Sequence, residues 1–311
     1  MSDVAGQSEF PLDEEFVRKL LNSQFPSLGI GTISYLGEGW DSVAFQVDSS
    51  GTNSKLVFRF PKRCERQVWV ESEIATLRLL EMRPLSVGIP VPTYVGKPGP
   101  SFPFPFMGYR LLAGTLGDRV QTGFMAKNEN ARRLGELLTA VHEIDPQEAA
   151  ANGVLPCPSP LDEVLAETAA MHDIVSQHLP AELAVRCRPY LEGTCAIPDT
   201  PNPALCLVHG DLVDEHILLD DAGRVTGVID WGDSCLADPA MDFGGLYAWL
   251  GEDFVRSVLA HYAVPFAPSF LNRITFRARC YALAALGYSL QGRDTSQADR
   301  LPLVYTAFGM A

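Results

Sequence analysis

Two aspartates beside glycines most constrain how this chain can fold. Asp211 lies in the run His-Gly-Asp, and Asp230 lies in the run Ile-Asp-Trp-Gly-Asp. Short aliphatic runs lie between them, at Ile217–Leu219 and Val228–Ile229. Aliphatic runs of this length bounded by turn residues are typical of β-strands. The spacing therefore predicts a loop, a hairpin of two strands and a second loop, with both carboxylates presented to one cleft.

The composition indicates a soluble globular protein with room for two lobes. The chain has 311 residues, of which 47% are apolar, and a mean hydropathy of +0.05. No apolar stretch reaches the roughly 18 residues needed to span a bilayer. Met1–Glu15 is acidic and lacks the basic and apolar regions of a signal peptide. Seven cysteines without CxxC spacing indicate reduced thiols, so we expect a cytoplasmic protein without a membrane contact.

The acidic surplus lies in the second half of the chain. Residues 1–112 carry 11 Lys and Arg against 12 Asp and Glu, whereas residues 113–311 carry 13 against 26. This balance argues against a nucleic-acid partner, which requires a basic surface. A cationic small molecule is a plausible partner of the second half, since a cleft lined by one sign of charge concentrates its counter-ion. A surface that only confers solubility is the alternative.

The order of predicted elements differs between the two halves. The first half reads as a short helix, three strands, an amphipathic helix and two further strands: Leu12–Asn22, two strands within Gly31–Val47, Lys55–Phe60, Gln67–Met82, Tyr94–Gly96 and Phe106–Leu112. Apart from the loop–hairpin–loop, the second half reads as helices at Asn128–Ile144, Leu161–Leu179, Ala181–Leu191, Asp242–Leu250, Asp253–Tyr262, Ser269–Gln291 and Ala298–Phe308.

Together with the order of these elements, the two aspartate runs resemble the catalytic core of the aminoglycoside phosphotransferase family, which is related to the protein kinases. The resemblance covers roughly residues 27–250. It implies an α+β, bilobal, protein-kinase-like fold, with a small antiparallel-sheet N-lobe over residues 1–112 that ends in the hinge and a larger, mainly helical C-lobe over residues 113–311. It also implies Mg²⁺ and ATP or GTP as cofactors.

The resemblance implies roles for three residues of the loop–hairpin–loop. Asp211 would accept or orient the proton of the attacking hydroxyl, because phosphoryl transfer depends mainly on positioning and charge neutralisation. Asp230 would bind Mg²⁺, which prefers oxygen ligands. Most relatives carry asparagine where this chain has His216, and the members that act on the 2''-hydroxyl of aminoglycosides are similar in carrying histidine. His216 is thus a candidate at the metal or its waters, the alternative being a histidine that only stabilises the loop.

Glycines between the first two strands resemble the nucleotide loop of these enzymes. Gly37, Gly39 and Ser42 lie in the run Gly-Glu-Gly-Trp-Asp-Ser, and no Walker sequence is present. In this interpretation Ser42 and neighbouring N–H groups contact the β-phosphate. An ordinary tight turn is the alternative.

Arg59 stands where kinases carry the lysine that holds the α- and β-phosphates. A guanidinium can bind phosphate bidentately and stays charged. Lys62 is a competing candidate, and Glu73 is the preferred ion-pair partner, with Glu71 second. The hinge that receives the purine is expected at Met107, Gly108, Tyr109 and Arg110, which leaves adenine and guanine both open.

Acidic residues of the second half are candidates for binding the ammonium groups of a substrate. Glu163 and Glu167 share one helix face by their spacing, and Glu252 and Asp253 form a second pair. Solvated surface carboxylates are the alternative for each. His209 is expected to stabilise its loop through backbone hydrogen bonds. Asp242 is expected to stabilise the first turn of its own helix.

The sequence therefore predicts a phosphotransferase that moves the γ-phosphate of ATP or GTP to a hydroxyl of a small molecule, first of all an aminoglycoside antibiotic. A macrolide kinase, or a kinase of a metabolite such as choline or an amino sugar, is the alternative within the class. A catalytically inactive, pseudokinase-like nucleotide-binding module is the alternative from another class. No obligate protein partner is evident.

Overall fold

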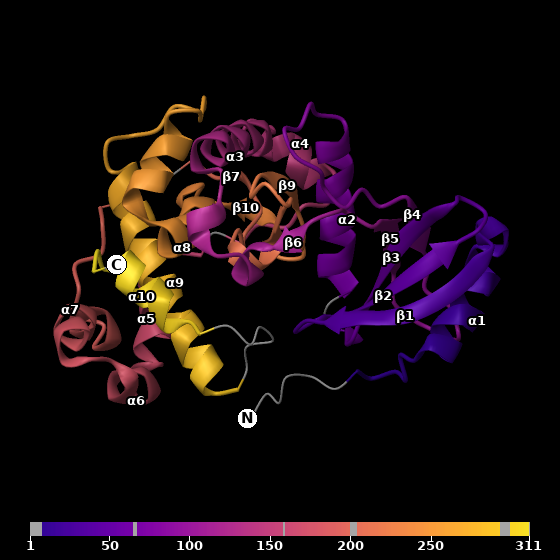
Figure 1. Cartoon of the computed structure of the whole chain (residues 1–311), viewed down its shortest axis with the longest axis horizontal. Helices are drawn as coiled ribbons and strands as arrows, with labels where there is room; N and C mark the ends of the chain where they lie inside the picture. The colour runs from indigo at the N-terminus through magenta and orange to yellow at the C-terminus, as the bar shows by residue number, and fades with distance from the viewer. Residues whose placement is uncertain (1–7, 65–66, 158, 200–203, 293–298, 311) are drawn as a thin grey trace. The chain divides into compact units, whose positions relative to one another are not determined.

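The computed structural model describes residues 8–64, 67–157, 159–199, 204–292 and 299–310 (Figure 1). By their contacts, residues 1–82 with 89–112 form one unit, and residues 83–88 with 113–311 form a second. The first unit is built on an antiparallel sheet and the second is mainly helical, as the predicted α+β fold class requires.

The first unit contains a five-stranded antiparallel sheet with the strand order β1-β2-β3-β5-β4. Its elements are α1 (Glu14–Gln24), the 3-10 turn η1 (Pro26–Leu28), β1 (Ile30–Glu38), β2 (Ser42–Ser49), β3 (Ser54–Pro61), α2 (Gln67–Glu81), β4 (Tyr94–Gly96) and β5 (Phe106–Arg110). Every element predicted for this half is present, with ends that differ by a few residues.

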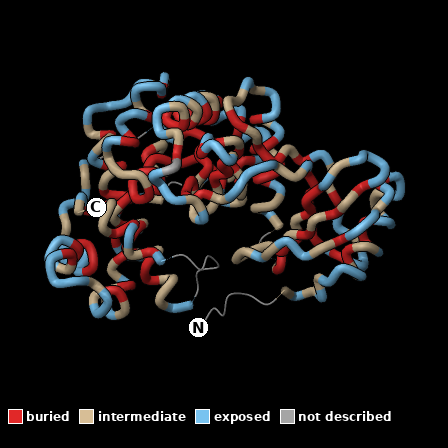
Figure 2. The backbone as a smooth tube through the Cα atoms, viewed as in Figure 1, coloured by how far each residue is buried: buried red, intermediate tan, exposed pale blue. Residues whose placement is uncertain are grey.

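Aromatic residues fill the core of this sheet. Figure 2 marks the buried positions of the backbone in red. Phe58 and Phe60 of β3 are fully buried, and the ring of Phe60 lies 4.9 Å from that of Phe106. Successive side chains of a strand point to opposite faces. Arg59, between the two phenylalanines, therefore points away from the aromatic core, toward α2.

The second unit places two small sheets among helices. Its helices are α3 (Lys127–His142), α4 (Pro146–Ala151), α5 (Leu161–Ala169), α6 (His172–Val175), α7 (Ala181–Leu191), α8 (Ala240–Leu259), α9 (Phe270–Leu290) and α10 (Leu301–Ala307). Its strands are β6 (Thr115–Leu116), β7 (Cys206–Val208), β8 (Ile217–Leu219), β9 (Val225–Val228) and β10 (Cys235–Ala237). They form the sheets β6-β8-β9 and β7-β10.

Three helices of the second unit differ from the prediction. The helix expected over Leu161–Leu179 ends at Ala169, and at the break Met171 packs against Gly287 of α9. The short helix α4 was not predicted. The two helices expected around residues 242–262 are the two halves of α8, which bends where Gly251 adopts a φ of 83°. No helix in the described part of the chain is long and apolar enough to cross a membrane.

The short segment before β4 belongs to the second unit rather than the first. The Gly88 N–H donates to the carbonyl of Thr226 at 2.9 Å, and the Val228 N–H donates to the carbonyl of Gly88 at 2.9 Å. These bonds attach residues 83–88 to β9, although the sequence places them between two elements of the first unit.

Candidate active site

The predicted loop–hairpin–loop is present in the second unit. β7 ends at Val208, a loop and a 3-10 turn (η6, Asp214–His216) follow, and β8 then pairs antiparallel with β9. Asp211 lies in the first loop and Asp230 lies just beyond β9. Asp230 has a φ of 60°, a left-handed conformation that is uncommon for a residue with a side chain. Such strain concentrates at functional sites.

His216 lies between the two aspartates. Its Nδ1 is 3.6 Å from Oδ2 of Asp211, and its Nε2 is 3.7 Å from Oδ2 of Asp230. Nδ1 also donates to the backbone carbonyl of Asp211 at 2.8 Å. The structure therefore brings together the three residues singled out in this region of the sequence, with both carboxylates partly exposed.

The two carboxylates control the charge of this imidazole. Burial disfavours the imidazolium, but the carboxylates of Asp211 and Asp230 and the hydrogen bond to the Asp211 carbonyl outweigh it, and the pKa of His216 is raised to about 9. Because Nδ1 is bonded to a carbonyl, Nε2 is the ring nitrogen that faces Asp230. His216 thus stabilises the loop and adjoins the candidate metal ligand as well.

His209 connects the first loop to the strand before Asp230. Its Nε2–H donates to the carbonyl of Ile229 at 3.0 Å, and its Nδ1 accepts from the Asp211 N–H at 3.2 Å. Burial lowers the pKa of His209, which fits a neutral ring with one donor and one acceptor nitrogen. The prediction that His209 stabilises the loop through backbone hydrogen bonds is confirmed.

Asp242 supports the same loop from α8. Its buried carboxylate accepts the N–H groups of His209 and Gly210, each at 2.9 Å, and Nε2 of His142 at 3.0 Å. Burial alone would raise the pKa of Asp242, but the hydrogen bonds from His142 and the His209 backbone hold it below its usual range. Asp242 lies in the first turn of α8, as expected, and its oxygens also accept N–H groups of the loop. Asp238 accepts the Ala240 N–H at the start of the helix.

Two glycines allow the loop to approach its neighbours closely. Gly210 has a φ of 90°, and a Cβ there would collide with the carbonyl oxygen of Asp233. A Cβ on Gly245 of α8 would collide with the carbonyl oxygen of Leu212. Only glycine fits where backbones approach this closely, so the loop lies directly on α8.

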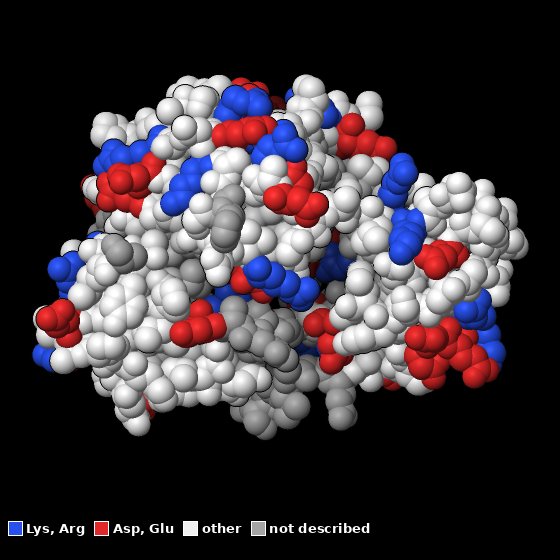
Figure 3. All heavy atoms as spheres, viewed as in Figure 1, with Lys and Arg blue, Asp and Glu red and all other residues white. Residues whose placement is uncertain are grey.

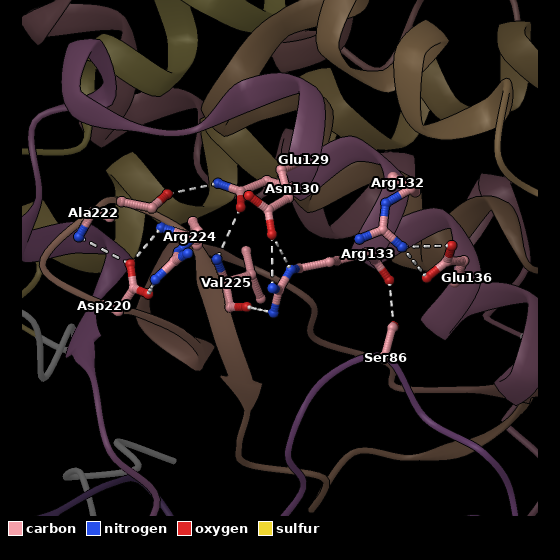
Figure 4. A network of polar contacts seen from close by, with 11 residues as sticks. Ser86, Glu129, Asn130, Arg132, Arg133, Glu136, Asp220, Ala222, Arg224 and Val225 are labelled. Carbon is pink, nitrogen blue, oxygen red and sulfur yellow. Dashed lines mark hydrogen bonds and ion pairs between the residues drawn. The ribbon is translucent and has the colours of Figure 1, made fainter.

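A buried asparagine holds the turn between β8 and β9 (Figure 4). Asn130 of α3 donates to the carbonyl of Gly223 at 2.9 Å and accepts the Val225 N–H at 2.8 Å. Arg133, one turn further along α3, donates to the Val225 carbonyl at 3.0 Å. The sequence carried a signal for this contact, because Asn130 is a polar residue on the apolar stripe of its predicted helix. It was nevertheless missed.

Arg300 contacts the turn that precedes His216. Its guanidinium lies 3.2 Å from Asp214 and 2.9 Å from Glu215, and its side chain is 2% exposed. Arg300 immediately precedes α10, far along the chain from the loop. No local pattern marks such a contact in advance, since it depends on where the C-terminal helix packs.

In the first unit, Arg59 forms the ion pair expected for it. Its Nη1 lies 2.6 Å from Oε1 of Glu73 on α2, and its Nη2 lies 3.3 Å from the Ser42 hydroxyl. The choice of Glu73 over Glu71 is confirmed. Lys62, the competing cation, instead pairs with Glu38, the last residue of β1. Arg59 is thus the cation that adjoins Ser42.

The glycine loop is a tight connection between β1 and β2. The Gly39 N–H donates to the carbonyl of Ser42 at 2.9 Å, and the strand register shifts between Tyr35 and Gly37. A Cβ on Gly37 or Gly39 would meet no atom within 4 Å. These glycines leave open space around the loop.

The expected hinge residues fall in two groups. Met107 and Gly108 pair with β3 on one side and β4 on the other, so their backbone lies inside the sheet. The pairing with β4 ends at Gly108, whereas the pairing with β3 continues through Tyr109 to Arg110. Backbone groups for a purine edge are therefore better expected from Tyr109 onward.

The predicted substrate-binding acids do not form one group. Glu163 and Glu167 are exposed on α5, which packs mainly against α7 and α9. Glu252 lies 2.6 Å from Arg256 and accepts the Tyr247 hydroxyl at 3.1 Å, while Asp253 is exposed. On the face shown in Figure 3, many of the acidic side chains adjoin basic ones rather than forming one continuous patch.

Asp230 suits a divalent cation better than His216 does. A carboxylate supplies the hard oxygen that Mg²⁺ prefers, whereas imidazole suits transition metals. Within the described residues, no three His, Cys, Asp or Glu side chains are grouped so as to hold a metal ion. Mg²⁺ usually takes one or two protein carboxylates and completes its shell with phosphates and water.

Comparisons with known proteins agree with this geometry. The model of the phosphotransferase enzyme family matches residues 32–271. The GDP complex of wild-type aminoglycoside 2'-phosphotransferase-IIIa has a TM-score of 0.73 and 26% identity, covering 96% of this chain and 99% of that one. The GDP and kanamycin complex of APH(2")-IIIa has a TM-score of 0.69 and 27% identity, covering 89% of this chain and 93% of that one.

A curated relative matches over a shorter segment. Viomycin phosphotransferase from Streptomyces vinaceus is 37% identical over 68 residues, which is 21% of this chain and 24% of that protein. A further curated relative is matched over 18% of its own length, so the chain spans less than a quarter of either. The family model, in contrast, covers most of the chain, including the loop–hairpin–loop and the Arg59–Glu73 pair. The chain belongs to the phosphotransferase enzyme family.

Proposed function

We propose that this protein is a Mg²⁺-dependent kinase that transfers the γ-phosphate of ATP or GTP to a hydroxyl of a cationic small molecule, with an aminoglycoside as the first candidate. The observation that carries the proposal is the placement of His216 between Asp211 and Asp230. In this arrangement Asp211 accepts or orients the proton of the acceptor hydroxyl. Asp230 holds the Mg²⁺, which neutralises charge on the phosphates.

The first unit supplies groups for the nucleotide. The guanidinium of Arg59, oriented by Glu73, is positioned to bind phosphate oxygens, with the Ser42 hydroxyl beside it. GTP is retained beside ATP because two similar structures are complexes with GDP. An aminoglycoside is favoured because one of these complexes also contains kanamycin, and because the second half of this chain is acidic.

The test is a nucleotide-consumption screen with the purified full chain. ATP and GTP are each offered with aminoglycosides, macrolides, choline and amino sugars, with Mg²⁺ or with a chelator. We expect Mg²⁺-dependent consumption that requires an aminoglycoside. Nucleotide consumption only with a macrolide or only with a metabolite would assign the substrate to that class instead. No transfer to any acceptor would refute the proposal.

The variant Asp211→Asn separates an enzyme from a nucleotide-binding pseudokinase. An enzyme should lose turnover by about 10²–10⁴-fold, the usual contribution of acid–base catalysis, and should bind nucleotide as before. If the wild type binds nucleotide but shows no turnover to lose, the pseudokinase alternative is correct.

A further inference from the structure

Two carboxylates flank the turn between β1 and β2, which is unfavourable for a loop that receives phosphates. Glu38, the last residue of β1, and Asp41 lie on either side of Gly39 and Trp40. Loops that bind phosphate usually offer N–H groups and no negative charge. A triphosphate close to two unneutralised carboxylates would be repelled. If the nucleotide binds here, as the proposed function requires, the chain must neutralise both.

Lys62 contacts both sides of this loop. Its side-chain Nζ lies 2.9 Å from Oε2 of Glu38, and its backbone N–H donates to the backbone carbonyl of Asp41 at 2.8 Å. The lysine side chain is only 6% exposed, whereas that of Glu38 is 54% exposed. A buried ammonium whose carboxylate partner lies at the exposed end of β1 holds the base of the loop in place.

The strand register explains why Lys62 can do this. Ser42, the first residue of β2, pairs with Pro61, the last residue of β3. The residues that follow Pro61 therefore lie beside the loop. Arg63 extends the contact, because its Nη2 lies 3.3 Å from Oδ1 of Asp41. Each loop carboxylate thus has a cation from the end of β3.

We propose that Lys62 is a positioning residue for the nucleotide: it neutralises Glu38 and holds the glycine loop in the conformation that accepts phosphates. The inference rests on the proposed function and deepens it. Arg59 binds the phosphates themselves, and Lys62 acts through the loop. The Lys62–Glu38 pair should stabilise the bound nucleotide equally in the ground state and in the transition state. Its loss therefore raises the KM for nucleotide and leaves kcat almost unchanged.

The test is a double-mutant cycle on the Kd for Mg²⁺-ATP and Mg²⁺-GTP, measured by calorimetry without any acceptor. Lys62→Gln should raise the Kd about tenfold, since it leaves Glu38 uncompensated beside the phosphates. In a Glu38→Gln background the same Lys62→Gln change should alter the Kd by less than about twofold, and Lys62→Arg alone should keep the wild-type Kd. Lys19→Gln is the matched control, because Lys19 pairs with Glu15 on an exposed helix face of the same unit.

Two results of the Kd measurements would overturn the proposal. One is an unchanged Kd in Lys62→Gln, and the other is an equal loss with and without Glu38, which would mean that Lys62 binds phosphate directly. Hydrogen exchange of the backbone amides of residues 36–44, measured without nucleotide, is a second test. It uses the variant Glu38→Ala, so it can be carried out even if Lys62→Gln fails to fold. Exchange should increase in Glu38→Ala, and unchanged exchange would contradict the proposal. A wild type that binds neither nucleotide would refute the proposed function, and the exchange measurement would still decide whether the Lys62–Glu38 pair orders the loop.

Discussion

Replacing Asp242 with asparagine should destabilise the second unit by about 3 kcal/mol. The buried carboxylate accepts three hydrogen bonds, from the N–H groups of His209 and Gly210 and from His142. Hydrogen bonds to a charged group contribute about 1.5–3 kcal/mol each, and an unsatisfied buried donor costs about 1–3 kcal/mol. Asparagine keeps one acceptor oxygen but places an NH₂ group against donors that the second carboxylate oxygen had accepted. About half of the stabilisation from the three hydrogen bonds is therefore lost.

The assay is urea unfolding at pH 7, followed by tryptophan fluorescence. Of the four tryptophans, Trp231 is buried with its ring 4.6 Å from that of His209. Asp253→Asn, on the exposed side of the same helix, should change the free energy of unfolding by less than about 0.5 kcal/mol. A loss below about 1 kcal/mol in Asp242→Asn, or an equal loss in Asp253→Asn, would refute the assignment of Asp242 as the support of the loop.

The pH dependence of this difference has a defined sign. The folded pKa of Asp242 lies below its ordinary value of 3.8. A carboxylate with a depressed folded pKa contributes stability that is present above the unfolded pKa and is lost as the pH falls through the folded pKa. The gap between wild type and Asp242→Asn should therefore be full at pH 7 and shrink below about pH 4. A gap that grows on acidification would contradict the assignment.

Two further substitutions test the loop from other directions. Gly210→Ala should lower the free energy of unfolding by more than about 3 kcal/mol, because it adds a collision with the Asp233 carbonyl to backbone strain. Gly153→Ala is the control: its φ is 97° and no atom lies nearby, so it should cost only the strain. Equal shifts of the thermal midpoint in the two variants would contradict this account. Arg300→Gln should lower stability by about 3–5 kcal/mol, since it leaves Asp214 and Glu215 without their buried cation, and a thermal midpoint unchanged from the wild type would show that Arg300 does not hold the turn.

The sequence alone determined the features that are local or repeat with a regular period. Aliphatic and aromatic residues around Arg59 predicted the strand over Lys55–Phe60. The resemblance to the phosphotransferases predicted that Glu73 of the following helix pairs with Arg59. Both the Arg59–Glu73 ion pair and the loop–hairpin–loop are present. Steric and hydrogen-bonding preferences of neighbouring residues are enough to specify such features.

Tertiary structure decided which buried charges meet across long stretches of chain. The sequence placed Asp242 in the first turn of a helix, where it lies, but gave no sign that its oxygens accept N–H groups of His209 and Gly210. It likewise gave no sign that Arg300 contacts Asp214 near His216. A buried charge must find a partner wherever packing places one, because leaving it unpaired is costly. The identity of the partner therefore depends on how α8 and the segment before α10 pack against the loop. It does not depend on the residues that neighbour the charge in the sequence.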